Sequence, residues 1–463
     1  MERTDEDRWH ACVLHDYRGS RAGLSESDVE DVEAEVPVGD LAAYGVGGSW
    51  QAPCPRARCT ASPESSRLSC SQRLCRRYSV GGPNGIPFRD RRFTESAVTA
   101  GCYRLSMITG QTVLGAYLPG ADAHTCPIDQ LPAGLLTHLF YAFATIEDGH
   151  LRLPSAAPAQ LAAIKLAHPH LRIVISIGGL GAGGFSDAAL TPNARADLAA
   201  ECLDMVGGLD GVDGVDLDWE FPVSGGPAEL VHRPEDRRNF TLLARELRDR
   251  LGPDHLLTAA LPAGRLQAAG PYNPSGSFEL PALADLLDFV NLMTYDFGTD
   301  FSGVATFNAP LAEVTDDPLD PDLRRWNNVT GAVEYYEQHG VPRDKLVLGV
   351  PFYGRGFRVT SPGEQAGLFQ PQIGTVEVGD WRDIKRDLLS DPAWQRHRHP
   401  VARTPWLYHP GTQVFVSYED AESIEERAAF AAGHGLRGAF TWQLAGDDTE
   451  RSLLAAMTRP FRG

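Results

Sequence analysis

The chain has 463 residues, 43% of them hydrophobic and 22% charged, and its formal net charge at pH 7 is −19. This composition is ordinary for a globular protein, and the strong negative charge argues against nucleic acid and anionic membranes as partners. No apolar run approaches the roughly 18 residues that span a bilayer, so the sequence predicts no membrane segment. A neutral or cationic polymer remains compatible with the charge.

The first 106 residues differ in composition from the rest of the chain. They hold six of the eight cysteines, at spacings that fit no zinc pattern: Cys12, Cys54, Cys59, Cys70, Cys75 and Cys102. Few aliphatic residues lie between positions 41 and 106. This favours a disordered extension, or translated sequence foreign to the native protein, over a small disulfide-bonded module. Residues 1–10 lack the features of a secretion signal, and Met107 is an alternative start.

From residue 111 on, apolar strand-like runs alternate with segments of helical period. Eight strands are predicted, at 112–118, 137–143, 172–178, 214–220, 256–262, 289–295, 346–353 and 438–443. Start signals and apolar stripes predict helices at 158–168, 193–206, 234–251, 328–339 and 422–433. Alternating strands and helices imply a parallel sheet buried on both faces. We therefore expect the α/β class, as a closed (β/α)8 TIM barrel over residues 107–460.

Residues 357–418, between the seventh and eighth strands, interrupt this alternation. The segment is rich in Pro and Gly, ends in a β-like stretch at 413–418 and is too long for a barrel loop. We predict a small α+β insertion there, at the C-terminal face of the barrel, where it would wall one side of a groove.

The fourth predicted strand carries carboxylates on alternate residues. Asp216, Asp218 and Glu220 share one face of an extended strand, while the residues between them are apolar. Like charges in a partly buried site raise at least one pKa, and a carboxyl that keeps its proton near neutral pH can act as a general acid. A cation site and a solvated strand face are the alternatives. Asp213 has the opposite parity and is expected at the start of the strand.

The reacting groups of a barrel lie at the C-terminal ends of its strands. This rule places Tyr117, Phe143, Glu220, Met293, Tyr295, Asp296, Tyr353, Arg355 and Trp442 at the candidate site. This set lacks the histidine cluster of a zinc hydrolase and the basic Gly-rich turn of a phosphate site, so we expect no metal and no cofactor. Aromatic rings and a buried acid suit a sugar polymer, because rings stack on pyranose faces and acids protonate glycosidic oxygens.

The usual pair of opposed carboxylates is hard to assemble from these residues. A retaining glycosidase needs a nucleophile about 5 Å from its acid, and an inverting one needs a base about 6.5–9.5 Å away. Asp218 lies behind Glu220 on the same strand face, where it is better placed to share a proton than to attack a sugar. This points to a substrate that supplies its own nucleophile, as a 2-acetamido group can.

Several motifs, in chain order, resemble the family 18 glycoside hydrolases, specifically chitinases with an inserted α+β domain. They are Ser176-Ile177-Gly178-Gly179, Asp213-x-x-Asp216-x-Asp218-x-Glu220, Met293-Thr294-Tyr295-Asp296, the stretches at 345–355 and 416–420, and Phe440-Thr441-Trp442-Gln443. The resemblance covers about residues 111–460. Members of the family are commonly exported, so an extracellular location is expected although this chain shows no signal, and we expect a monomer.

The resemblance implies a retaining, substrate-assisted hydrolysis of the β-1,4-N-acetylglucosamine linkages of chitin or chitooligosaccharides. Glu220 would act as general acid and then as general base, while Asp218 orients the acetamido nitrogen and Asp216 tunes Asp218. Tyr295 would donate to the acetamido oxygen, Asp296 would bind the sugar, and Trp442 would form the floor of its subsite. The resemblance thus makes Glu220, Asp218, Asp216 and Tyr295 the candidate catalytic residues. The candidate substrate-binding residues are Tyr117, Phe143, Trp219, Met293, Asp296, Tyr353, Arg355 and Trp442. An endo-β-N-acetylglucosaminidase and a non-catalytic chitin lectin are the alternatives. Such a lectin lacks the terminal acid, and the endoglycosidase usually lacks the insertion.

Overall fold

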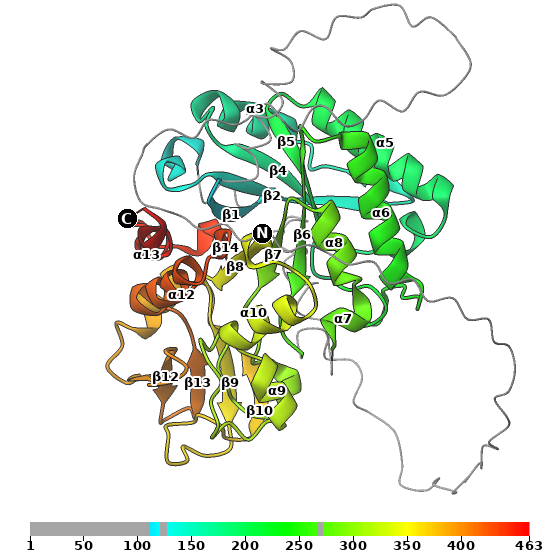
Figure 1. Cartoon of the computed structure of the whole chain (residues 1–463). Helices are drawn as coiled ribbons and strands as arrows, with labels where there is room; N and C mark the ends of the chain where they lie inside the picture. Colours follow the sequence, from blue (N-terminus) through cyan, green and yellow to red (C-terminus); the bar gives the residue numbers. More distant parts are fainter. Residues whose placement is uncertain (1–110, 121–126, 266–271, 463) are drawn as a thin grey trace, which may run out of the picture. The chain divides into compact units, whose positions relative to one another are not determined.

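The computed structural model describes residues 111–120, 127–265 and 272–462, so the predicted extension at 1–106 lies outside the described part. Eight parallel strands form one closed sheet (Figure 1). They are β1 (Val113–Pro119), β2 (His138–Glu147), β4 (Arg172–Gly178), β5 (Val212–Asp218), β6 (Leu256–Pro262), β7 (Phe289–Met293), β8 (Leu346–Pro351) and β14 (Gly438–Trp442). Pairing runs β1-β14-β8-β7-β6-β5-β4-β2, and a β1–β2 pairing closes the ring. The predicted (β/α)8 barrel is confirmed.

Helices surround the barrel, which explains why strands such as β6 are apolar and buried along their whole length. The helices are α3 (Ala157–Ala167), α4 (Phe185–Ala188), α5 (Pro192–Gly208), α6 (Asp236–Leu251), α7 (Pro274–Ser277), α8 (Leu280–Leu286), α9 (Pro321–Trp326), α10 (Val329–Gln338), α11 (Trp381–Asp383), α12 (Ala421–Gly433) and α13 (Ser452–Thr458). The five helices predicted from the sequence all occur, with ends within two residues of the predicted ones. In the described part of the chain, no helix combines the length and apolar character needed to cross a membrane.

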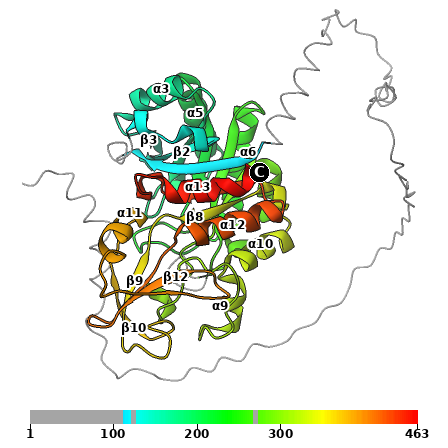
Figure 2. The ribbon, with the colours of Figure 1, turned by 90° about the vertical axis from the view of Figure 1, so that its left-hand side faces the viewer.

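Helix starts follow local capping chemistry. The side chains of Thr191, Asn328 and Asp420 each accept a backbone N–H of the first turn of the helix that follows. Asp420 and Ser423 form a reciprocal capping box at the start of α12. Helices α12 and α13 lie side by side in both views of the ribbon (Figures 1 and 2).

A second sheet occupies the interruption predicted at 357–418. Its strands pair antiparallel in the order β10-β9-β13-β12-β11, and they are β9 (Arg355–Val359), β10 (Gln372–Val376), β11 (Gln395–Arg398), β12 (Pro405–His409) and β13 (Val414–Ser417). A short hairpin strand, β3 (His150–Arg152), pairs only with β2. The second sheet begins at Arg355, two residues before the predicted start. Its core includes Phe307 from the segment after β7, a contribution that the sequence did not predict.

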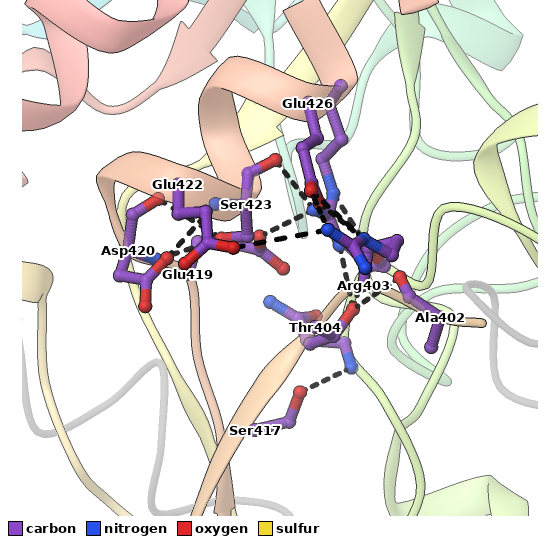
Figure 3. A network of polar contacts seen from close by, with 12 residues as sticks. Ala402, Arg403, Thr404, Ser417, Glu419, Asp420, Glu422, Ser423 and Glu426 are labelled. Carbon is purple, nitrogen blue, oxygen red and sulfur yellow. Dashed lines mark hydrogen bonds and ion pairs between the residues drawn. The ribbon is translucent and has the colours of Figure 1, made fainter. Parts of the chain in front are cut away.

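A buried ion pair ties the second sheet to α12. Arg427 of α12 is fully buried and lies 3.0 Å from Oε2 of Glu419, which is also fully buried. The same guanidinium donates to the carbonyl oxygens of Ser423 and Ala309 and to the hydroxyl of Thr404. In Figure 3, Thr404, Glu419 and Ser423 lie close to one another, with Arg403 and Glu426 beside them. One side chain therefore joins the barrel helix, the loop after β7 and the second sheet.

Candidate active site

Three acids follow one another at the C-terminal end of β5. Asp216 and Asp218 are buried within the strand, whereas Glu220 is half-buried and lies two residues beyond the strand's end. The strand predicted at 214–220 therefore stops earlier than expected. We call Asp216, Asp218 and Glu220 the acid row. Its outermost member is the one that a ligand at the strand ends can reach.

Asp216 is held by four neutral donors from four different strands. Its Oδ2 accepts hydrogen bonds from the Tyr117 hydroxyl and the Ser176 hydroxyl, both at 2.8 Å. Its Oδ1 accepts from the Thr258 hydroxyl at 2.5 Å and from Asn291 Nδ2 at 3.4 Å. Burial raises the pKa of Asp216 and these bonds lower it, with a net rise. Among the described residues, no guanidinium or ammonium hydrogen-bonds to Asp216, so these partners do not neutralise a negative charge on the row.

The two outer acids hold their protons more tightly than exposed carboxyls. Burial, and then the charges of Glu220 and Asp216, raise the pKa of Asp218 well above its usual value. Burial, and then the charge of Asp296, raise the pKa of Glu220 to about 8. Oδ1 of Asp218 is buried and has no hydrogen-bond partner among the described residues. A protonated carboxyl therefore stands at the end of the row near neutral pH, as general acid catalysis requires.

Close backbone packing beneath the row depends on glycine. Gly178 has φ of 111°, and a Cβ there would lie only 2.1 Å from the carbonyl oxygen of Asp218. The N–H of the next residue, Gly179, donates to that same oxygen at 2.9 Å. Any side chain at position 178 would push β4 away from β5, because no other residue tolerates both the contact and the positive φ.

Aromatic rings surround the end of the row. Trp442 is half-buried, stacks on Phe143 with ring centroids 5.6 Å apart, and lies 5.9 Å from the ring of Tyr117. Tyr295 packs edge to face against Tyr353 at 6.1 Å. The rings come from five strands or their ends. Met293, at the end of β7, is buried with them in the main core.

Asp296 links the barrel to the second sheet. Its Oδ1 accepts hydrogen bonds from the Tyr353 hydroxyl at 2.7 Å and from Arg355 Nε at 2.9 Å, and Arg355 Nη2 lies 2.7 Å away. Arg355 is the first residue of β9. The carboxylate is therefore occupied by a cation and a hydroxyl, although its charge still contributes to the raised pKa of Glu220.

Two predicted substrate contacts are corrected by the structure. Trp219 is 4% exposed and lies between the rings of Phe185 and Phe240, on α4 and α6, at centroid distances of 5.2 and 5.9 Å. It faces the helices rather than the groove, because it has the opposite parity to the acids. Tyr117 is 2% exposed, so its hydroxyl serves Asp216 and its ring offers no open face to a sugar.

Asp213 lies where its parity placed it, at the start of β5. Its carboxylate accepts hydrogen bonds from Lys165 Nζ and Arg172 Nη1, both at 2.8 Å. It also accepts the backbone N–H of Ile173 at 2.8 Å. It belongs to an ion-paired cluster at the far end of the strand and not to the acid row.

Comparison with known proteins agrees with this geometry. Residues 114–447 match the family described as Glycosyl hydrolases family 18. The chain belongs to this family.

Two relatives are identical to the chain at about a third of the aligned positions. It is 37% identical to "Chitinase A1" of Niallia circulans over 310 residues, which is 62% of this chain and 42% of that protein. It is 31% identical to "Chitotriosidase-1" of Mus musculus over 341 residues, covering 69% of this chain and 68% of the relative. The match therefore spans less than half the length of the first of these relatives.

A solved family 18 structure shows the same fold. The N-acetylglucosaminidase of Paenibacillus barengoltzii superposes with a TM-score of 0.66 at 28% identity, covering 76% of this chain and all of that one. The resemblance inferred from the motifs is thus confirmed at the level of the family.

The fold also brings to the site several residues that no sequence motif indicated. Thr258 and Asn291 bind Asp216 from β6 and β7, and Asn308 accepts the backbone N–H of Asp296. Strand register could have indicated Thr258, since Ser176, Asp216 and Thr258 occupy paired positions on three adjacent strands. Phe301, in the same loop as Asp296, has a ring that is 40% exposed, and neither hydrophobic periodicity nor a sequence motif indicated it.

Proposed function

We propose that this family 18 chain is a chitinase that hydrolyses β-1,4-N-acetylglucosamine linkages of chitin and chitooligosaccharides with retention of anomeric configuration. The observation that carries the proposal is the position of Glu220, half-buried at the outer end of the acid row just beyond β5, where burial and the charge of Asp296 raise its pKa. Two relatives named as chitinase and chitotriosidase support the substrate class. Residues 107–460 would form the catalytic unit, and 357–418 its inserted subdomain.

Glu220 would donate its proton to the glycosidic oxygen as the bond to the anomeric carbon breaks. The acetamido oxygen of the substrate would attack that carbon from the other face and give an oxazolinium ion. Glu220, now ionised, would remove a proton from water as the water opens the ring, which restores the carboxyl. Asp218 would accept the acetamido N–H and balance the positive charge, with Asp216 behind it, and Tyr295 would donate to the acetamido oxygen.

The state of Asp296 favours this route over a protein nucleophile. A carboxylate that already accepts hydrogen bonds from Arg355 and Tyr353 would have to break them before attacking a sugar. Asp218 is buried behind Glu220 on the same strand. Neither acid is poised as a second catalytic carboxylate, so an internal acetamido nucleophile accounts best for the arrangement.

The remaining predicted contacts would form the groove. Trp442, stacked on Phe143, would floor the subsite of the reacting sugar, with Met293 in its wall. Asp296, Tyr353 and Arg355 would bind sugar hydroxyls along the side formed by the second sheet. The chemistry as proposed needs no metal or cofactor. A monomeric state and an extracellular location stay predictions from the resemblance.

A second candidate is an N-acetylglucosaminidase acting on other glycans by the same steps. The N-acetylglucosaminidase of Paenibacillus barengoltzii, which shares the fold, favours this candidate. A non-catalytic lectin is disfavoured because Glu220 is present.

The test is hydrolysis of a chitin hexamer followed by NMR at early times, with a glucose hexamer of the same β-1,4 linkage as control. Retention predicts that new reducing ends appear first as the β anomer. The glucose hexamer should stay intact because it has no acetamido group. Initial α anomer, or efficient cutting of the glucose hexamer, would refute the mechanism. Cleavage of glycoprotein glycans but not of chitin would select the second candidate.

A further inference from the structure

A buried amide connects Asp296 to the second sheet. Asn308 is fully buried, and its Oδ1 accepts the backbone N–H of Asp296 at 3.0 Å. The carbonyl oxygen of Asn308 accepts the N–H of the following residue, Phe297, also at 3.0 Å. Two consecutive backbone donors are thus held by one residue that lies 12 positions further along the chain.

The conformation of Asp296 explains why such a clamp is needed. Asp296 has φ of 56°, in the left-handed region that non-glycine residues avoid unless the surroundings hold them there. That turn lies between buried Tyr295 and buried Phe297 and directs the carboxylate of Asp296 to Tyr353 and Arg355. Without the acceptor on Asn308, the buried N–H of Asp296 would lose its partner and the extended conformation would be favoured again.

Asn308 is itself anchored to the second sheet. Its backbone N–H donates to the hydroxyl of Ser417 at 2.9 Å, and Ser417 is a fully buried residue at the end of β13 (Figure 3). Ser417 pairs directly with Arg355 in the β13–β9 register. Asn308 connects the backbone of Asp296 to Ser417, and Arg355 binds the carboxylate of Asp296. Because Ser417 and Arg355 are paired residues, both parts of Asp296 are attached to the same position of the second sheet.

The next residue along the chain carries the anchorage to the barrel helix. The carbonyl oxygen of Ala309 accepts hydrogen bonds from Nε and Nη2 of buried Arg427, which also pairs with Glu419. Asn308 is thus held by β13, and its neighbour Ala309 is held by α12. Asn308 therefore has a fixed backbone from which its side chain can hold Asp296 in place.

We propose that Asn308 is a positioning residue for the hydrolysis, whose side-chain amide holds Asp296 in its left-handed turn and so keeps that carboxylate on Arg355 and Tyr353, beside Glu220. Asn308 touches no substrate in this scheme and acts through Asp296 and through its side-chain hydrogen bond with Tyr353. The inference rests on the proposed function, because it requires an active acid at Glu220.

The deciding experiment is a double-mutant cycle on kcat/KM with a chitin hexamer. Asn308→Ala should lower kcat/KM by about 10–100-fold, mostly in kcat, because a misplacement near 1 Å can cost a factor of that size. In an Asp296→Asn background the same change should cost less than about twofold, since the group it positions is already lost. An equal loss in both backgrounds would show a general structural role and overturn the proposal.

Two further variants keep the test decisive. Asn308→Asp retains the acceptor oxygen and should recover most of the activity lost in Asn308→Ala. If the alanine variant fails to fold, Ser417→Ala replaces it, with a smaller loss that should also vanish in the Asp296→Asn background. Full activity of both Asn308→Ala and Ser417→Ala in the wild-type background would equally overturn the proposal.

Asn327 supplies a matched control. It is also buried, and its Oδ1 also accepts a backbone N–H, that of Arg265 at 2.6 Å. Asn327→Ala should lower thermal stability to a similar degree as Asn308→Ala while changing kcat/KM by less than about twofold. If the wild type cuts another N-acetylated glycan and not chitin, the proposed substrate fails, and the same cycle on that glycan still decides the role of Asn308.

Discussion

Two groups of buried carboxylates in this chain have opposite surroundings. Glu220 ends a row of acids whose described hydrogen-bond partners are hydroxyls and an amide, whereas Glu419 faces the guanidinium of Arg427. Burial raises both pKa values, to about 8 for Glu220 and about 7 for Glu419. The charge of Asp296 adds to the rise at Glu220, while the charge of Arg427 opposes the rise at Glu419.

Accessibility separates the two groups further. Glu220 is half-buried at a strand end among half-buried rings, whereas Glu419 is fully enclosed beneath α12 and the second sheet. A raised pKa alone therefore does not identify a catalytic acid. A catalytic acid also needs an open side from which the substrate can take its proton.

The largest expected effect comes from Glu220→Gln. Because the amide cannot transfer the proton, kcat/KM on a chitin hexamer should fall by about 10²–10⁴-fold. The melting temperature should stay close to that of the wild type, since no cation loses its partner. Glu419→Gln is the matched control and should lower the melting temperature while the folded fraction keeps its turnover. Near-normal turnover of Glu220→Gln would contradict the assignment of the acid.

Arg427→Met tests the buried ion pair between Arg427 and Glu419. It leaves Glu419 buried without its counter-ion, so the free energy of unfolding should fall by about 3–5 kcal/mol. Chemical denaturation measures this directly. Arg386→Met is the control, because the Arg386 side chain is 65% exposed and its pairs with Asp383 and Asp387 lie at the surface. That variant should leave the denaturation midpoint close to that of the wild type.

Tyr117→Phe tests whether this ring serves Asp216 or the sugar. Losing one donor to a buried carboxylate should lower kcat by about tenfold and leave KM within about twofold. The control is Tyr141→Phe, which removes another buried hydroxyl, one that donates to Gln160 at 2.5 Å on the helix side of β2. A large rise in KM for Tyr117→Phe would restore the predicted sugar contact.

The smallest expected effect is a shift in the pH profile of Asp296→Asn. Glu220 must be protonated to act as an acid, so kcat/KM of the wild type should fall as pH rises through about 8. Removing the charge of Asp296 removes one cause of that raised pKa, so the alkaline limb should move to lower pH. Asp316→Asn, at an exposed position, should leave the limb unchanged. A shift to higher pH would show that Asp296 does not act through its charge on Glu220.

Local patterns were sufficient for most of the barrel. Strand runs, helix caps and apolar period depend on neighbouring residues, so β4 and β6 have the predicted ends and all five predicted helices occur. The acid row was predictable for the same reason, because alternate residues of a strand share a face. The same rule argues against the predicted sugar contact of Trp219. Trp219 is at an odd position, opposite in parity to the acids, and it packs against Phe185 and Phe240.

By itself, the sequence determined the family, the barrel and the order of the acids, because each depends on spacing within a short segment. Only the tertiary structure decided which groups meet those acids. Thr258 and Asn291 reach Asp216 from separate strands, and Asn308 reaches Asp296 from the far side of a loop. Such contacts depend on strand register and on how the second sheet packs against the barrel, and neither leaves a periodic signal in the chain. The physical reason is that a hydrogen bond requires proximity in space, whereas a pattern records only proximity in sequence.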